Sequence, residues 1–231
     1  MNRVGAVVLV RYNSSRLPGK ALMNILGKPV LLYIVERLQE VFSNGQIVIA
    51  TSSEDSDQPI AKFALESGIN CFRGSLENVA ERFYEAAKSQ NWDYAMRVNG
   101  DNIFADIHLI EKVKKLSERG VSDFISNVKD RTFPKGMSIE SVRLSYYESL
   151  LPKINSSEYY KEHVTAYLYD NTRTDFEFIY NTEIPSAAGL QLALDTTEDF
   201  ERSASLISQF ESNHINYNIR EILNLIESHE E

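Results

Sequence analysis

The hydrophobic pattern opens with an unbroken apolar run at residues 4–10, Val-Gly-Ala-Val-Val-Leu-Val. A run that is apolar on both alternating faces is typical of a buried parallel strand. Residues 30–41 then carry apolar side chains three or four positions apart, the period of an amphipathic helix, and Asn44-Gly45 ends this pattern. The chain is therefore predicted to begin with a buried strand, a polar loop and a helix.

The alternation of strand-like and helix-like segments continues to the C-terminus. Pro59 suits the first turn of a helix that ends before Gly68, Ser75 is expected to cap a helix that runs to about Gln90, and Gly120 is expected to end the helix before it. Alternating strands and helices predict an α/β fold, a three-layer αβα sandwich around a mostly parallel, mixed sheet. Further strands are expected at 46–51, 69–72, 94–98, 124–127, 138–142, 176–180 and 190–194, and further helices at 107–119, 145–151, 157–170, 197–210 and 218–227.

The composition predicts one domain that spans residues 1–231. Hydrophobic residues make up 43% of the chain and charged residues 25%, as in ordinary globular proteins. The N-terminal apolar run is too short to span a membrane and lacks the pattern of a signal peptide, so a cytoplasmic location is expected. The single cysteine, Cys71, excludes an internal disulfide framework, and its apolar neighbours predict a place in the core.

The distribution of charge along the chain is more informative about possible ligands than the net charge of −9. That net charge argues against binding to nucleic acids or anionic membranes. Residues 1–35 nevertheless contain five basic residues and no acidic one, whereas residues 175–231 contain twelve acidic residues and two basic ones. An acidic chain arranged in this way can bind an anionic ligand through a local cluster of cations or through a metal ion.

The stretch from Arg11 to Lys20, with the sequence RYNSSRLPGK, carries the strongest chemical signal. It follows the first buried strand, where open α/β sheets bind ligands. Its three cations, two hydroxyls and backbone N–H groups suit a polyphosphate. A P-loop would require Gly at position 14 and Ser or Thr at position 21, but Ser14 and Ala21 stand there, and no G-x-G-x-x-G motif is present. A surface turn with scattered basic residues is the alternative.

The loop resembles the signature of the CMP-sugar synthetases, the cytidylyltransferases that activate Kdo and sialic acid-like sugars, and in particular the spore-coat polysaccharide branch. The resemblance implies a nucleotide-diphospho-sugar transferase fold of Rossmann-like type. It implies Mg²⁺-dependent transfer of CMP from CTP to a sugar acceptor, an acidic 2-keto sugar for a surface polysaccharide, with release of pyrophosphate. It also implies a homodimer, with residues 128–175 as a sugar-side and dimerisation excursion. Further matching stretches are 51–55, 73–84, 97–101, 131–140, 162–165 and 194–201.

The resemblance also implies the roles of individual residues. Asp101 and Asp195, each predicted to follow an apolar strand at the carboxyl edge of the sheet, are the implied magnesium ligands, although a turn role would also explain Asp101. Arg82 would reach the nucleotide or form an ion pair, and His163 would contact the sugar or pack on its helix. The implied catalytic residues are Arg11, Lys20, Asp101 and Asp195; the nucleotide-binding residues are Arg11, Ser14, Ser15, Arg16, Gly19, Lys20 and Arg82; the sugar-side residues are Glu140 and His163.

Three departures from the family pattern concern the acceptor side. Asn102-Ile103-Phe104 replaces a segment that contains Pro in the family, which we expect to loosen the loop, and Lys135 and Ser138 replace acids. Two rival functions therefore stay open. A sugar-1-phosphate nucleotidyltransferase would carry a glycine-richer first loop, and a non-catalytic nucleotide-binding regulator would not need both Asp101 and Asp195. The sequence alone does not name the sugar or fix the base.

Overall fold

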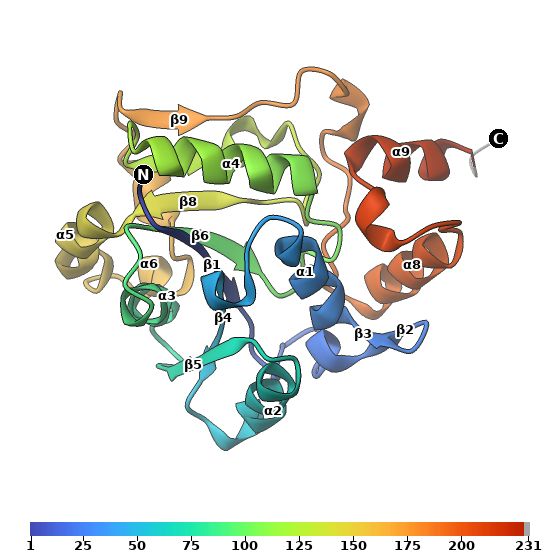
Figure 1. Cartoon of the computed structure of the whole chain (residues 1–231), viewed down its shortest axis with the longest axis horizontal. Coiled ribbons are helices and arrows are strands. Elements are labelled where there is room, and N and C mark those ends of the chain that lie inside the picture. The colour runs from blue at the N-terminus through green and yellow to red at the C-terminus, as the bar shows by residue number, and fades with distance from the viewer. Residues whose placement is uncertain (229–231) are drawn as a thin grey trace.

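The computed structural model describes residues 1–228, which are built around a mixed sheet of seven strands (Figure 1). The strand order is β5-β4-β1-β6-β8-β7-β9, and in Figure 1 the sheet runs from β9 at the top to β5 at the bottom. The strands are β1 (Val4–Leu9), β4 (Ile47–Ser52), β5 (Asn70–Gly74), β6 (Tyr94–Asn99), β7 (Phe124–Ser126), β8 (Glu140–Arg143) and β9 (Phe176–Phe178).

Strand β1, the predicted first strand, lies in the interior of the sheet. All six of its residues are buried, and it pairs in parallel with β4 on one side and β6 on the other. β8 is antiparallel to both β6 and β7, whereas β9 is parallel to β7. The prediction of a mostly parallel, mixed sheet is therefore confirmed, and its parallel half gathers the carboxyl ends of β1 and β6 at one edge.

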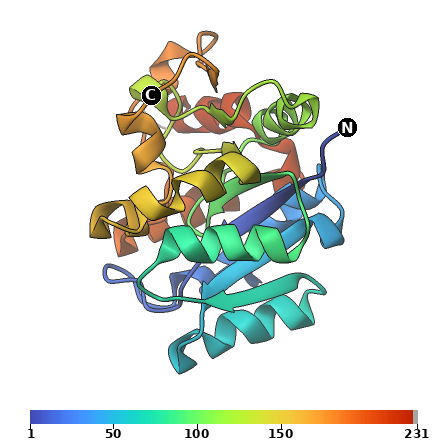
Figure 2. The ribbon, with the colours of Figure 1, turned by 90° about the vertical axis from the view of Figure 1, so that its left-hand side faces the viewer.

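Helices cover both faces of the sheet and divide the core in two. Side chains of β1 alternate between the two halves, with Val8 in one and Val7 in the other. On the second face α3 and α5 lie side by side (Figure 2). The first face carries α1 (Val30–Gln39), α2 (Gln58–Glu66), α4 (Ile107–Arg119), α8 (Thr197–Ser208) and α9 (Ile219–Glu227), and the second carries α3 (Val79–Ser89), α5 (Leu144–Ile154), α6 (Glu158–Glu162) and α7 (Ala166–Asp170).

Several predicted helix boundaries are confirmed. α4 spans the predicted residues, and Gly120 ends it in the left-handed conformation at φ 67°. The prediction for Ser75 is wrong. Asn78 caps α3 by accepting a hydrogen bond from the Glu81 N–H, while the Ser75 hydroxyl accepts from the Asn78 N–H one turn earlier. The motif therefore contains two successive caps, and the second one starts the helix.

The predicted helix at 157–170 is broken. Helix α6 ends at Glu162, and α7 begins at Ala166. Between them Val164 adopts a φ of 31°, which a β-branched residue rarely takes and which interrupts the helical hydrogen bonds. His163 and Thr165 consequently lie in a bend between two short helices instead of on one helical face.

Cys71 is exposed, so the prediction that it belongs to the core is wrong. It lies on β5, which pairs only with β4 and forms an edge of the sheet. An edge strand receives cover from one neighbour only, so apolar residues around a cysteine do not ensure its burial. Within residues 1–228, no helix has both the length and the apolar character needed to cross a membrane.

A buried histidine makes the stability of the fold depend on pH. The His214 ring lies 2.6 Å from the Glu36 carboxylate through Nε2, and its Nδ1 is buried without a partner in the described chain. Burial lowers the pKa of His214 to about 4, although Glu36 opposes the shift. Between a pH of about 6.5 and about 4, His214 is therefore protonated in the unfolded chain but stays neutral in the native state.

We expect the free energy of unfolding to fall as the pH is lowered from about 6.5 towards 4, by up to about 1.4 kcal/mol per pH unit from this one group. His214→Gln keeps a donor for Glu36 but does not titrate. Denaturant unfolding of both proteins at pH 7, 6 and 5 measures the difference. Parallel pH profiles for the two proteins would show that His214 does not cause this dependence.

Candidate active site

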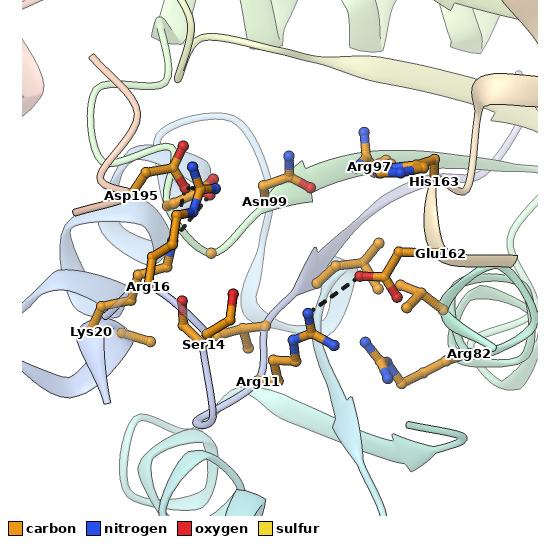
Figure 3. A pocket seen from close by; sticks show the side chains of 17 residues that line it. Arg11, Ser14, Arg16, Lys20, Arg82, Arg97, Asn99, Glu162, His163 and Asp195 are labelled. Carbon is orange, nitrogen blue, oxygen red and sulfur yellow. Dashed lines mark hydrogen bonds and ion pairs between the residues drawn. The ribbon is translucent and has the colours of Figure 1, made fainter. Parts of the chain in front are cut away.

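A cavity of about 320 Å³ opens at the carboxyl ends of β1 and β6 (Figure 3). The predicted loop at 11–20 supplies one wall, and the turn after β6 supplies another. Nine of the predicted residues line it: Arg11, Ser14, Ser15, Arg16, Lys20, Arg82, Asp101, His163 and Asp195. The structure thus brings segments that are far apart in sequence into one site, which we call the first cavity.

One end of the first cavity holds both predicted magnesium ligands. The Lys20 ammonium lies 3.3 Å from an oxygen of Asp101 and 3.3 Å from an oxygen of Asp195, and it donates to the Leu194 carbonyl at 2.7 Å. The Arg16 guanidinium donates to the same Asp195 oxygen at 2.8 Å. Two carboxylates that are far apart in the sequence therefore share the Lys20 ammonium of the signature loop.

Asp195 was predicted to follow a strand at residues 190–194, but it follows an irregular segment instead. Residues 190–194 do not form a strand of the sheet; Gln191 makes an isolated bridge to Lys135, and the Leu194 N–H donates to the Asp101 carbonyl at 3.1 Å. The segment passes so close to Gly136 that a Cβ there would lie 2.4 Å from the Ala193 nitrogen. Gly136 is therefore required for the approach that delivers Asp195 to Asp101.

Asp101 has the properties of a cation ligand. Burial raises the pKa of its carboxyl group, with the nearby Asp195 adding to the rise and Lys20 opposing it. Its Oδ1 is buried and has no hydrogen-bond partner within residues 1–228. No group of three or more His, Cys, Asp or Glu side chains suited to a metal ion occurs in the described chain. Two carboxylates and an unused oxygen fit Mg²⁺, which commonly takes one or two carboxylates and completes its shell with substrate oxygens and water.

The loop that follows Asp101 is well packed, contrary to the expectation that loss of Pro would loosen it. Asn102 is buried and donates through its amide to the Ser138 carbonyl at 2.9 Å. The buried Arg37 donates to the Ala105 carbonyl at 3.2 Å. Hydrogen bonds from two other segments thus replace the rigidity that a proline would give.

The signature loop is positioned by an acid that the sequence analysis missed. The family-like turn suggested Asp55, but the buried Asp57 accepts from the Tyr12 N–H at 2.7 Å, and also from Thr51 and Ser52. Burial would raise the pKa of Asp57, but these hydrogen bonds hold it below its ordinary value. Gly19 does not line the cavity; at φ 74° it turns the chain so that Lys20 faces the carboxylates.

The opposite end of the first cavity contains two further arginines (Figure 3). Arg11 pairs with Glu162 at 3.3 Å, and both side chains are partly exposed. Arg82 is buried and donates to the backbone carbonyls of Ser75 and Leu76, while its Nε has no partner in the described chain. Burial lowers its pKa to about 10, so it remains charged at neutral pH. Among residues 1–228 Arg82 has no ion-pair partner, so its charge is available to a ligand.

A second cavity of about 520 Å³ adjoins the first one. Arg97, Asn99 and His163 line both cavities, and Lys129 and Arg131 line only the second. The predicted sugar-side residue His163 packs its ring against Tyr159 at 4.6 Å between ring centres. Glu140 also borders this cavity, but it is only 2% exposed and its carboxylate is fully bonded inside the protein. Both Glu140 oxygens already accept hydrogen bonds from the protein, so this arrangement does not favour a direct contact between Glu140 and a sugar.

Arg97 and Asn99 were missed as site residues, although a signal for them existed. They alternate on β6 immediately before Asp101, and alternate residues of a strand face the same side. A strand that is otherwise apolar but carries polar residues at alternate positions before a candidate ligand indicates a binding face.

A cytidylyltransferase family model matches residues 6–222. The chain belongs to the cytidylyltransferase family. This cytidylyltransferase is 29% identical over 213 residues to the spore coat polysaccharide biosynthesis protein SpsF of Bacillus subtilis, a match that covers 89% of this chain and 87% of SpsF. The resemblance stated from the sequence is confirmed.

Solved structures agree with this assignment. A cytidylyltransferase from Leptospira borgpetersenii has a TM-score of 0.89 and 29% identity, over 100% of this chain and 96% of that one. A CMP-2-keto-3-deoxy-manno-octonic acid synthetase in complex with CTP has a TM-score of 0.66 and 18% identity, over 90% of this chain and 99% of that one, which shows a shared fold. The cytidylyltransferase therefore has the predicted nucleotide-diphospho-sugar transferase fold of Rossmann-like type.

Proposed function

We propose that this cytidylyltransferase binds CTP and Mg²⁺ in the first cavity and transfers CMP to a sugar in the second cavity, with release of pyrophosphate. The observation that carries the proposal is the meeting of Lys20, Asp101 and Asp195 in one cluster beside the signature loop. A polyphosphate needs the cations, and a divalent metal needs the carboxylates. We propose a cytoplasmic location, because the reaction consumes CTP, which is a cytoplasmic nucleotide.

The chain's own residues act by binding and orienting. Arg11, Arg16 and Lys20 donate to the triphosphate, Ser14 and Ser15 add hydroxyl donors, and the buried Arg82 contributes charge from the opposite wall. Asp101 and Asp195 would hold the Mg²⁺, which neutralises phosphate charge and lowers the pKa of a nearby hydroxyl.

The transfer itself asks little covalent chemistry of the protein. The acceptor oxygen forms a bond to the α-phosphorus, the bond from that phosphorus to the bridging oxygen of pyrophosphate breaks, and the hydroxyl proton passes to water. Fixing the oxygen in line with the leaving group supplies much of the rate, as in phosphoryl transfer generally.

The second cavity carries cations with which an acidic sugar can pair, although acids balance them in number. Arg97, Lys129 and Arg131 supply three cations to it, and Asp130, Glu140 and Asp170 supply three acids, one of which, Glu140, is already paired with Arg97. We therefore propose a 2-keto sugar acid as the acceptor. A sugar 1-phosphate is the second candidate, because the same cations suit a phosphate.

The decisive assay is pyrophosphate release from CTP and Mg²⁺ with a panel of 2-keto sugar acids, sugar 1-phosphates and neutral sugars. We expect release that depends on CTP, on Mg²⁺ and on a sugar acid. Release with sugar 1-phosphates alone would favour the second candidate, and CTP binding without release from any mixture would favour a regulatory role.

We further propose that the chain is a homodimer formed through residues 128–175. Six of the twelve tyrosines fall in 131–170; Tyr147 is buried in the core, but Tyr159 is 58% exposed. Aromatic residues are enriched at protein interfaces. We expect light scattering at micromolar concentration to give twice the monomer mass and Tyr159→Glu to lower it, with Tyr180→Glu, an exposed tyrosine outside the segment, as the control. A monomeric wild type would contradict this proposal.

A further inference from the structure

A row of polar side chains crosses three strands beside the second cavity. Arg97 on β6 lies directly opposite Glu140 on β8, and Ser126 on β7 lies opposite Glu140 from the other side. The Glu140 carboxylate accepts hydrogen bonds from the Arg97 guanidinium, from the Thr165 hydroxyl at 2.8 Å and from the Tyr169 hydroxyl at 2.6 Å. Strand β6 and helix α7, with its N-cap residue Thr165, thus converge on one carboxylate.

This network is not explained by stability alone. Removing a carboxylate and a guanidinium from water is costly, and well-packed apolar residues often stabilise a fold as well as a buried ion pair does. Every donor around Glu140 is instead used to fix its two oxygens, and Glu140 in turn fixes one edge of Arg97. The result is a guanidinium held in one position.

Arg97 stands where the two cavities meet. It lines both, its side chain is 18% exposed, and Glu140 is the only hydrogen-bond partner of its guanidinium within residues 1–228. Its Nε is buried without a partner in the described chain, so the N–H groups at the end of the guanidinium that Glu140 does not occupy are the ones that can bind a ligand. Asn99 lies between Arg97 and Asp195 in Figure 3. Arg97 and Asn99 alternate on β6, so one face of this strand leads from the junction towards the carboxylates.

We propose that Glu140 is a positioning residue that holds the Arg97 guanidinium at the junction of the two cavities, where Arg97 binds the anionic group of the acceptor. This inference rests on the proposed function, because it takes the second cavity as the acceptor site. The attacking oxygen must meet the α-phosphate at this junction, and a fixed fork of N–H donors can bind a carboxylate or a phosphate in two places at once. Arg97 would then set the distance between acceptor and nucleotide.

The other cations of the second cavity lack such support. Arg131 is exposed, and Lys129 lies over the Phe178 ring without an ion pair in the described chain. They are suited to attract an anion, whereas Arg97 is suited to orient it. Arg131→Gln is therefore the matched control, since it removes one cation from the same cavity and leaves the Glu140 network intact.

The test compares Glu140→Gln, Arg97→Lys, the double variant and Arg131→Gln. Two probes are used in the presence of CTP and Mg²⁺, 3-deoxy-manno-octulosonate for a carboxylate and glucose 1-phosphate for a phosphate. We expect Glu140→Gln and Arg97→Lys each to raise the KM for the preferred probe by about tenfold or more, with a smaller change in kcat and CTP affinity within about threefold. Arg131 also lines the second cavity, so Arg131→Gln should raise the KM as well, but by less than either of these variants, about threefold.

The double variant separates positioning from general damage. If Glu140 acts through Arg97, the double variant is no worse than Arg97→Lys, whereas two independent structural defects would multiply. Multiplying losses would overturn the positioning role. Should Glu140→Gln not fold, Tyr169→Phe, which removes one hydrogen bond to Glu140, takes its place with a smaller expected shift.

The inference and the proposed function fail in different ways. A wild type that binds CTP but binds neither probe at millimolar concentration overturns the contact with an acceptor anion. Failure to bind CTP overturns the proposed function instead, and it is measured without any sugar. Preference for one probe identifies the anion as a carboxylate or a phosphate.

Discussion

Asp101→Asn is expected to abolish most turnover while leaving the fold intact. The substitution replaces one oxygen of Asp101 by an NH₂ group that cannot bind a metal ion, and it removes the negative charge of one of the two carboxylates around Lys20. Loss of a ligand that holds the metal against the phosphates should cost about 3 kcal/mol or more in the barrier, about 100-fold or more in rate. Because burial raises the pKa of Asp101, a neutral amide should leave the stability of the metal-free protein unchanged or slightly higher.

Asp195→Asn should give a similar loss, and the two losses should not add. Both carboxylates act through one ion, so a second substitution removes little that remains. Nucleotide binding by the cationic loop should persist in all three variants, measured by calorimetry without Mg²⁺. Asp123→Asn is the control, because Asp123 forms an ion pair with Arg143 at 2.7 Å on the same sheet and lies outside both cavities. Near-normal Mg²⁺-dependent turnover in either Asn variant would make that aspartate a turn residue only.

Lys20→Ala should lower CTP affinity or the rate by about tenfold or more. The ammonium is 13% exposed and is placed to make charge-assisted hydrogen bonds to phosphate, each of which contributes about 1.5–3 kcal/mol. Its loss also removes the one cation that bonds to both Asp101 and Asp195 in the described chain, and leaves Asp195 paired with Arg16 alone. We therefore expect Mg²⁺ alone to raise the melting temperature of Lys20→Ala more than that of the wild type.

Lys28→Ala provides the comparison for Lys20. Lys28 pairs with Glu36 at 2.5 Å and does not line either cavity, so its loss should affect stability more than CTP affinity. Equal CTP affinity in both variants and the wild type would exclude the signature loop as the phosphate site.

The sequence was most informative where local chemistry decides the structure. The buried strand predicted at 4–10, observed at Val4–Leu9, and the helix at 107–119 with Gly120 at its end follow from periodicity and capping alone, and both are confirmed. The loop at 11–20 follows this strand, and its role as a phosphate site stays a prediction.

The sequence was less informative where distant segments decide. Residues 190–194 are apolar enough for a strand, but they form backbone hydrogen bonds with Lys135 instead of joining the sheet. This pairing, and the bond from the Leu194 N–H to the Asp101 carbonyl, bring Asp195 next to Asp101. Glu140 lies in a family-like motif that suggests sugar binding, yet its bonds to Arg97 and Tyr169 take it out of reach. No local pattern contains these tertiary contacts, so the residues could be named but their roles could not.

Nucleotide choice tests the central claim most directly. Calorimetric binding of CTP, UTP, ATP and GTP is measured with Mg²⁺ under identical conditions, together with thermal stabilisation, which rises as RT ln(1 + [L]/Kd) for a ligand that binds only the native state. The account predicts that CTP binds at least about tenfold more tightly than the others and gives the largest rise in melting temperature. Equal affinities for all four nucleotides would show that only the phosphates are recognised and would contradict the assignment of CTP to the first cavity.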